Sequence, residues 1–189
     1  MKNEIFGKEL KILKSFIEFI NAQTGVYCSI IGGFTWNKVR IERQIPRVQK
    51  PVGRKIKDGQ EVIMWESVED PTLPDCLHIR IIKANDYINI NSEAEFNEQQ
   101  ICWAIIIFIF AKWDEEIRPQ IAKIRGIDVK EIKINEFGDL RILRHSVVHN
   151  GGILEKKAYS KLTVMQDIVI SDSLIQLNHE QMYKLFRYL

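Results

Sequence analysis

An arginine and two histidines lie close together in one short segment of the chain. Residues 139–152 read Asp-Leu-Arg-Ile-Leu-Arg-His-Ser-Val-Val-His-Asn-Gly-Gly and include Arg144, His145 and His149. Arginine is a permanent cation whose planar fork of N–H donors suits phosphate oxygens. Histidine is the side chain whose unperturbed pKa lies nearest neutrality, which suits general acid–base catalysis. Together these side chains could activate a ribose 2′-hydroxyl and stabilise charge on a phosphoryl group without a metal.

The spacing of Arg144 and His149 limits how one helix could use them. They are five residues apart, so their side chains point roughly 140° apart on an ideal helix. One helix would not easily aim both at one phosphate. Two copies of the helix that meet across a two-fold axis could place them in a shared cleft.

Two other interpretations of these residues stay open. His145 and His149 have the i, i+4 spacing of two zinc ligands. Ser146, however, stands where an H-E-x-x-H motif has its glutamate, and no nearby cluster of Cys or Asp supplies a third ligand. We therefore predict neither a metal nor a cofactor. Alternatively, the basic side chains serve only to cap the helix, because the helix dipole favours positive charge at its C-terminus.

The segment that would hold these side chains has a helical pattern. Leu140, Leu143 and Val147 recur at i, i+3 and i+7, which predicts a helix that begins between residues 135 and 139. Gly151-Gly152 follow where a helix commonly takes a left-handed C-terminal cap.

A second, longer helix is predicted from Ser92 to Arg118, with a capping box formed by Ser92 and Glu95 at its start. Its middle is apolar on all sides, so we expect burial on more than one face and part of its surface in a subunit interface. Pro119 should kink or end it, and residues 120–126 continue it briefly.

The remaining segments are predicted to be a mixture of helix and strand. Helical spacing predicts a helix over residues 4–22 that stops at Gly25, and Asn178 begins a short final helix. Strands and loops are predicted over 26–91. The β-branched and aromatic runs are at 26–31, 62–65, 77–82, 161–165 and 168–170. His78 is interpreted as a half-buried strand residue and His179 as a surface residue.

Composition and charge bound the class of protein. A chain of 189 residues with 46% apolar residues predicts one domain, 1–189, with a real core, and its length also allows two small domains. Three widely spaced cysteines argue for a reducing compartment, and the longest apolar run, 101–111, is about half of a membrane span. With no recognisable signal peptide, we expect a cytoplasmic protein without membrane contact.

The charge is unevenly distributed along the chain. Residues 38–57 carry eight Lys or Arg against Glu42, whereas 58–99 carry ten acids against Arg80 and Lys83. The basic segment is predicted to be a mobile loop or an exposed ribbon. Either the basic and acidic segments are two solvated surfaces that partly neutralise each other, or the basic segment is a strip that binds the phosphate backbone of a nucleic acid.

The motif resembles that of a known superfamily. Arg144-His-Ser-Val-Val-His149 matches the R-x4-6-H motif of the HEPN superfamily, and the flanking residues and the preceding helix are similar over about residues 92–152. This resemblance implies an antiparallel helical bundle that dimerises. In active members, the motif Arg and His of both subunits form a metal-independent endoribonuclease centre.

The resemblance also implies roles for single residues. Arg144 would bind the scissile phosphate and His149 would act as general acid or base. His145 stands where the superfamily often has Asn or Asp, which departs from the commonest pattern. Arg141 and Arg118 would be substrate-binding residues. Further candidates in the preceding helix are Asp114 and Glu115.

The resulting prediction is an α+β protein, a mostly helical HEPN-like bundle with a long buried helix, a motif-bearing helix and a small β-sheet or hairpin. Its parts are a helix and β-rich segment over 1–91, the helical core over 92–152, and short β elements with a final helix over 153–189. The predicted function is a metal-independent, homodimeric ribonuclease, a toxin or defence component. The alternative is a non-catalytic dimeric module that binds RNA, a nucleotide or a protein partner such as a nucleotidyltransferase.

Overall fold

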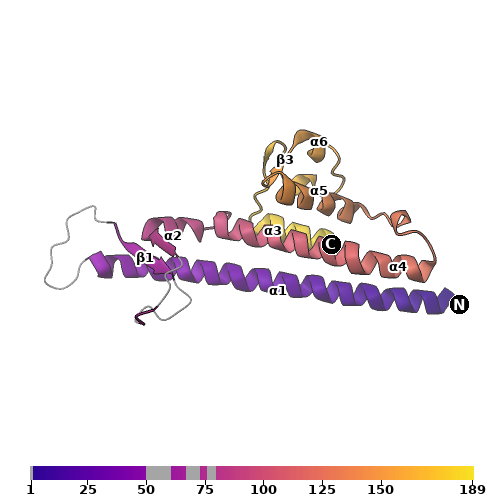
Figure 1. Ribbon diagram of the computed structural model, residues 1–189, viewed down its shortest axis with the longest axis horizontal. Helices are drawn as coiled ribbons and strands as arrows, with labels where there is room; N and C mark the ends of the chain where they lie inside the picture. The colour runs from indigo at the N-terminus through magenta and orange to yellow at the C-terminus, as the bar shows by residue number, and fades with distance from the viewer. Residues whose placement is uncertain (1, 50–60, 67–72, 76–79) are drawn as a thin grey trace. The chain divides into compact units, whose positions relative to one another are not determined.

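The first helix is far longer than the sequence predicts. In the computed structural model, α1 spans Lys2–Gln49 as one helix (Figure 1). The predicted helix end at Gly25 and the predicted strand over 26–31 are therefore wrong. Apolar side chains of this stretch also recur at helical spacing, and Tyr27 and Ile41 are buried. Burial on a helical face outweighs the propensity cost of the interior glycines, about 1 kcal/mol each.

The basic segment lies partly in this helix. Residues 38–49 are helical, so the predicted mobile loop or ribbon is wrong there, and Pro46 lies inside the last turn of α1. Pro46 cannot donate a backbone hydrogen bond to the carbonyl of Glu42, and its ring crowds that carbonyl, so the helix continues through this turn at a local cost. Residues 50–57 lie outside the described residues.

The structure describes residues 2–49, 61–66, 73–75 and 80–189, which fall into two units. Unit 1 comprises the described residues up to Ser29 together with Gln99–Leu189, and unit 2 comprises those of Ile30–Glu98. The predicted strand residue His78 lies outside the described residues. The fold is mostly helical with two small antiparallel sheets, which confirms the predicted helix-dominated α+β class.

Unit 2 contains the predicted small sheet. Strands β1 (Ile63–Glu66) and β2 (Arg80–Lys83) are antiparallel, with Ile63 opposite Lys83. They are followed by α2 (Ala84–Ile90), which was not predicted because this stretch was interpreted as strand and loop. Ala84 and Tyr87 of α2 are buried against Ile41, and this i, i+3 pair explains the helix.

The predicted long helix is present, but it begins at Phe96, later than predicted, and its predicted brief continuation after Pro119 ends at Arg125. It consists of α3 (Phe96–Ala111), a π-helical turn η1 (Lys112–Ile117) and α4 (Arg118–Arg125). Pro119 lies in the first turn of α4 and has no backbone N–H to donate. The helical path continues because the wider π-helical turn before it tolerates this missing hydrogen bond.

Among the helices that the structure describes, none has the length and apolar character needed to cross a membrane.

The predicted capping box at the start of α3 does not form. The hydroxyl of Ser92 donates to the carbonyl of Ile88 in the preceding helix at 2.9 Å. The carboxylate of Glu98 instead accepts from the backbone N–H of Ala94 at 2.7 Å. The helix therefore begins later than the capping-box pattern indicates.

The core of unit 1 is built on α3 and an aromatic cluster. Cys102 is fully buried, as predicted for a core residue. The rings of Trp113 and Phe137 stack with centroids 4.1 Å apart, and Phe16 of α1 lies 5.9 and 5.6 Å from them. These contacts join the first helix, the π-helical turn η1 and the next long helix into one core.

The motif-bearing helix is α5 (Asn135–His149), preceded by the short 3₁₀ turn η2 (Val129–Glu131). Strands β3 (Ile153–Leu154) and β4 (Ser173–Leu174) form a second antiparallel pair. Between and after them come the short helical elements α6 (Lys156–Tyr159), η3 (Gln166–Ile168) and α7 (His179–Tyr188).

The strands predicted at 161–165 and 168–170 are absent; the first stretch is irregular and the second overlaps η3. The carboxylate of Asp139 accepts hydrogen bonds from the backbone N–H groups of Thr163, Val164 and Met165 at 2.6–3.0 Å. Because a side chain takes these donors, they are not available to a strand.

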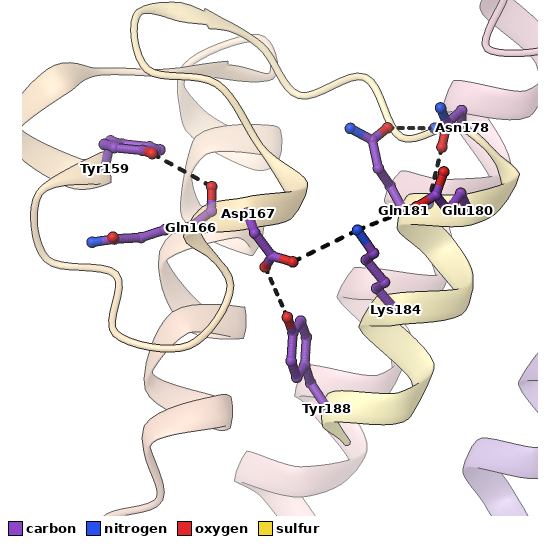
Figure 2. Close-up of polar contacts among 8 residues, drawn as sticks. All are labelled: Tyr159, Gln166, Asp167, Asn178, Glu180, Gln181, Lys184 and Tyr188. Carbon is purple, nitrogen blue, oxygen red and sulfur yellow. Dashed lines mark hydrogen bonds and ion pairs between the residues drawn. The ribbon is translucent and has the colours of Figure 1, made fainter.

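The final helix α7 forms as predicted, and polar contacts hold it to η3 (Figure 2). Asn178 and Gln181 form a reciprocal capping box at its start. Asp167 of η3 accepts a 2.8 Å hydrogen bond from the Tyr188 hydroxyl and pairs with Lys184 at 3.8 Å. The hydrogen bond to Asp167 raises the pKa of Tyr188.

The predicted surface residue His179 is exposed. Its ring stacks with that of buried Tyr27, with centroids 5.8 Å apart.

Candidate functional site

The structure places Arg144, His145 and His149 in the last two turns of α5, as predicted. Leu140 and Leu143 are fully buried and hold the helix to the core of unit 1. The helix ends where the sequence predicts. Gly151 and Gly152 have φ of 59° and 84°, the left-handed region, and the N–H of Gly152 donates to the carbonyl of Ser146 at 2.9 Å.

Gly152 is required by space as well as by backbone angle. A Cβ at this position would lie 2.4 Å from the indole ring of Trp103. The Trp103 Nε1–H donates to the carbonyl of Ile175 at 2.9 Å, so the ring cannot move freely. The end of the motif helix is thereby packed closely against α3.

His145 and His149 form a pair on the surface of α5. Both side chains are exposed, and their ring centroids are 4.8 Å apart at an interplanar angle of 44°. Arg141 is also exposed and lies one turn before His145 on the same side of the helix. Two imidazoles that are close together and open to solvent can give and accept protons in the same reaction.

Arg144 has a different environment. Its side chain is half-buried, and its guanidinium carbon lies 5.6 Å from the centroid of the Phe110 ring of α3. This cation–π contact positions the charge while leaving its N–H donors available. The guanidinium has no hydrogen bond or ion pair to any other residue in the described parts of the chain.

Within one chain, the structure therefore brings His149 together with His145 and not with Arg144. The histidines share one side of α5, and Arg144 lies against α3. This agrees with the divergence of about 140° that the five-residue spacing imposes.

The predicted substrate-binding residues Arg118 and Arg141 line one pocket in unit 1. Its volume is about 510 Å³, and Lys130, Lys133 and Lys161 also line it. Sequence reasoning assigned no role to these three lysines, because they lie in separate segments that only the fold brings together.

The acidic candidates in η1 differ from each other. Asp114 lies in the pocket and pairs with Arg118, with Oδ1 and Nη1 2.9 Å apart. Glu115 is exposed and does not line the pocket. Asp114 is therefore placed to orient Arg118, whereas Glu115 has no such contact.

Sequence reasoning gave no role to Asp139, which is buried and is the most heavily hydrogen-bonded side chain near the motif. The sequence did contain a signal that Asp139 is buried. It lies four residues before Leu143 and seven before Ser146, on the same inward-facing side of the helix. Ser146 is also buried, and its hydroxyl has no hydrogen-bond partner among the described residues.

His145 and His149 supply two potential metal ligands. The described part of the chain contains no group of three or more His, Cys, Asp or Glu side chains that could hold a metal ion.

Comparisons with protein-family models, with curated proteins and with solved structures find no match for this chain.

Proposed function

We propose that this protein is a metal-independent endoribonuclease of the HEPN type that acts as a homodimer, as a toxin or defence component. The observation that supports this most strongly is the exposed imidazole pair of His145 and His149 at the end of α5. Arg144 is close to this pair in sequence, and its guanidinium has no acidic partner among the described residues. Proton transfer and charge neutralisation are the two requirements of metal-independent RNA cleavage.

In the proposed reaction, one imidazole takes the proton of a ribose 2′-hydroxyl, and that oxygen attacks the adjacent phosphorus. The bond to the 5′-oxygen breaks, and the other imidazole protonates this leaving oxygen. The products are a 2′,3′-cyclic phosphate and a 5′-hydroxyl. We assign His149 as one member of the pair and His145, whose ring centroid lies 4.8 Å away, as the other.

The arginine of each proposed site comes from the other subunit. Because Arg144 and His149 diverge on one helix, a two-fold axis beside α5 would bring the arginine of one chain to the histidines of its copy. Arginine suits this role, because its fork can bind two phosphate oxygens as negative charge develops.

Exposed apolar side chains next to the motif support the dimer. Val148 is 45% exposed, and the cross-strand neighbours Ile153 and Leu174 are 49% and 39% exposed. Covering this surface with a second copy would remove apolar area from water, which favours association. Ile153→Asp should therefore yield monomers by light scattering, whereas Ile127→Asp, in an exposed turn elsewhere in unit 1, should not.

The experiment that tests the proposal is RNA cleavage in EDTA. Wild-type protein should cleave, and Arg144→Ala and His149→Ala should lose cleavage while staying folded and dimeric. Arg144→Lys is the matched control, because it keeps the charge but not the planar fork, and should retain partial activity. Wild-type activity in His149→Ala would contradict the role assigned to His149.

The second candidate function is a non-catalytic dimeric module that binds RNA or a protein partner. The exposed apolar residues around β3 and β4 favour it, since they need no catalytic site. This candidate predicts a dimer with no cleavage in either wild type or variants.

A further inference from the structure

The pocket in unit 1 is large enough for a small organic ligand. Its volume is about 510 Å³, which lies within the range of roughly 300–1,000 Å³ found for small-molecule sites. Its walls come from the end of α3, η1, α4, the loop around η2, the first half of α5 and the turn at residues 161–163. The pocket lies one helical turn from the histidine pair, because Arg141 lines it and precedes His145 by four residues.

The pocket carries an excess of positive charge. Lys130, Lys133, Arg141 and Lys161 have exposed side chains, and none of them pairs with a carboxylate among the described residues. These four cations are therefore free to bind an anion, which can accept a charge-assisted hydrogen bond from each.

The two carboxylates that line the pocket do not cancel this charge. Asp114 is paired with Arg118 at 2.9 Å. Asp139 is buried, and its oxygens accept hydrogen bonds from Thr163, Val164 and Met165. Neither carboxylate forms an ion pair or hydrogen bond with Lys130, Lys133, Arg141 or Lys161 among the described residues.

Arg118 adds an unsatisfied donor. Its Nη1 binds Asp114, but its Nε is buried without a hydrogen-bond partner in the described part of the chain. A buried donor without an acceptor is unfavourable, and an anion that accepts from the Nε–H of Arg118 would relieve it.

The rest of the wall is apolar. Phe110, Ile132, Ile134 and Ile142 line the pocket, and Ile134 is 40% exposed. The pocket therefore combines cations for a phosphate with an apolar surface for a flat organic group. A free inorganic anion would use only the first of these features.

We propose that this pocket binds a nucleotide, with its phosphate at Lys130, Lys133, Arg141 and Lys161 and its base against the apolar wall. The nucleotide is either free or part of an RNA strand. Binding here requires no cleavage, so a free nucleotide goes beyond the proposed function, whereas an RNA segment rests on it, because Arg118 and Arg141 are its predicted substrate-binding residues. Binding is therefore tested in His149→Ala protein, where loss of catalysis does not affect the result.

The test is calorimetric titration of full-length His149→Ala protein with AMP, inorganic phosphate and adenosine. AMP should bind most tightly, because it alone uses both parts of the pocket. Lys133→Gln and Arg141→Gln should each weaken AMP binding roughly tenfold, the effect of losing one charge-assisted hydrogen bond. Lys156→Gln and Lys157→Gln are matched controls, because these lysines are exposed in α6 and do not line the pocket.

Titration with a short, non-cleavable RNA oligonucleotide distinguishes a free nucleotide from a nucleotide that is part of an RNA strand. If AMP matches the oligonucleotide in affinity, the ligand is a free nucleotide. If the oligonucleotide binds more tightly and loses affinity in Lys133→Gln and Arg141→Gln, it is an RNA segment. The proposal is overturned if neither binds, if adenosine binds as tightly as AMP, or if the α6 variants lose as much affinity as the pocket variants.

Discussion

The first half of α5 holds a buried carboxylate, Asp139, whereas its last two turns hold Arg144, His145 and His149 with their charged or titratable groups available. Asp139 accepts hydrogen bonds from three backbone N–H groups and one hydroxyl. The three basic side chains have only ring contacts to other described residues.

This difference separates structural from chemical roles on one helix. A polar group that is buried and fully hydrogen-bonded stabilises the fold, and its loss leaves other groups unsatisfied. An exposed group without a hydrogen-bond partner contributes little to the fold and is free to act on a ligand. Substitutions in the two halves of α5 should therefore affect different properties.

The largest expected effect on stability is that of Asp139→Ala. The backbone donors of Thr163, Val164 and Met165 would lose their acceptor, so the free energy of unfolding should fall by about 3 kcal/mol or more. Chemical denaturation measures this. His149→Ala, the control from the other half of the helix, should change it by less than about 0.5 kcal/mol. Equal losses in both variants would remove the distinction between the two halves.

A smaller effect is expected where α5 ends. Gly152→Ala should destabilise the protein by about 2 kcal/mol, because it combines a left-handed φ with a Cβ 2.4 Å from the Trp103 ring. Gly151→Ala is the matched control, since it has a similar φ but nothing within 4 Å of the added atom. It should cost only about 1 kcal/mol. If the two variants were equally stable, close packing on Trp103 would not matter.

The smallest effect is expected at the surface pair of Glu9 and Arg125, which hydrogen-bond at 2.8 and 3.1 Å. The hydrogen bond from Arg125 lowers the pKa of Glu9. Its stabilising effect is therefore fully present above the unfolded-state pKa and is lost as pH falls through the lower folded-state pKa. Solvent screening keeps it below about 1 kcal/mol.

Thermal unfolding across acidic pH tests this pair. Glu9→Gln should be less stable than wild type at neutral pH and should approach it as the pH falls. A difference that grew with acidity would have the wrong sign for this pair.

The sequence predicts the motif helix well because its signals are local. The spacing of Leu140 and Leu143 and the pair Gly151-Gly152 give its face and its end, and both are confirmed. The same local signals fail for α1. Gly25 indicates a helix end, but Tyr27 and Ile41 pack on residues distant in sequence and keep the helix continuous.

The pocket and the role of Asp139 could not be predicted for the same reason. The pocket cations occur in separate segments from Arg118 to Lys161, and no spacing relates them. The groups that donate hydrogen bonds to Asp139 are backbone N–H groups of residues 163–165, and no pattern of side chains in the sequence indicates them. Both features depend on contacts between segments that only folding brings together.

The most direct test of the shared Arg/His site is complementation between two inactive variants. Arg144→Ala and His149→Ala chains are co-expressed with different tags, and the mixed dimer is purified and assayed for RNA cleavage in EDTA. In a shared site, the intact arginine of one chain meets the intact histidines of the other, so one of the two sites in each mixed dimer works. A shared site should therefore give the mixed dimer about half of the wild-type rate. A mixed dimer as inactive as either parent, with an active wild type, would contradict the shared site.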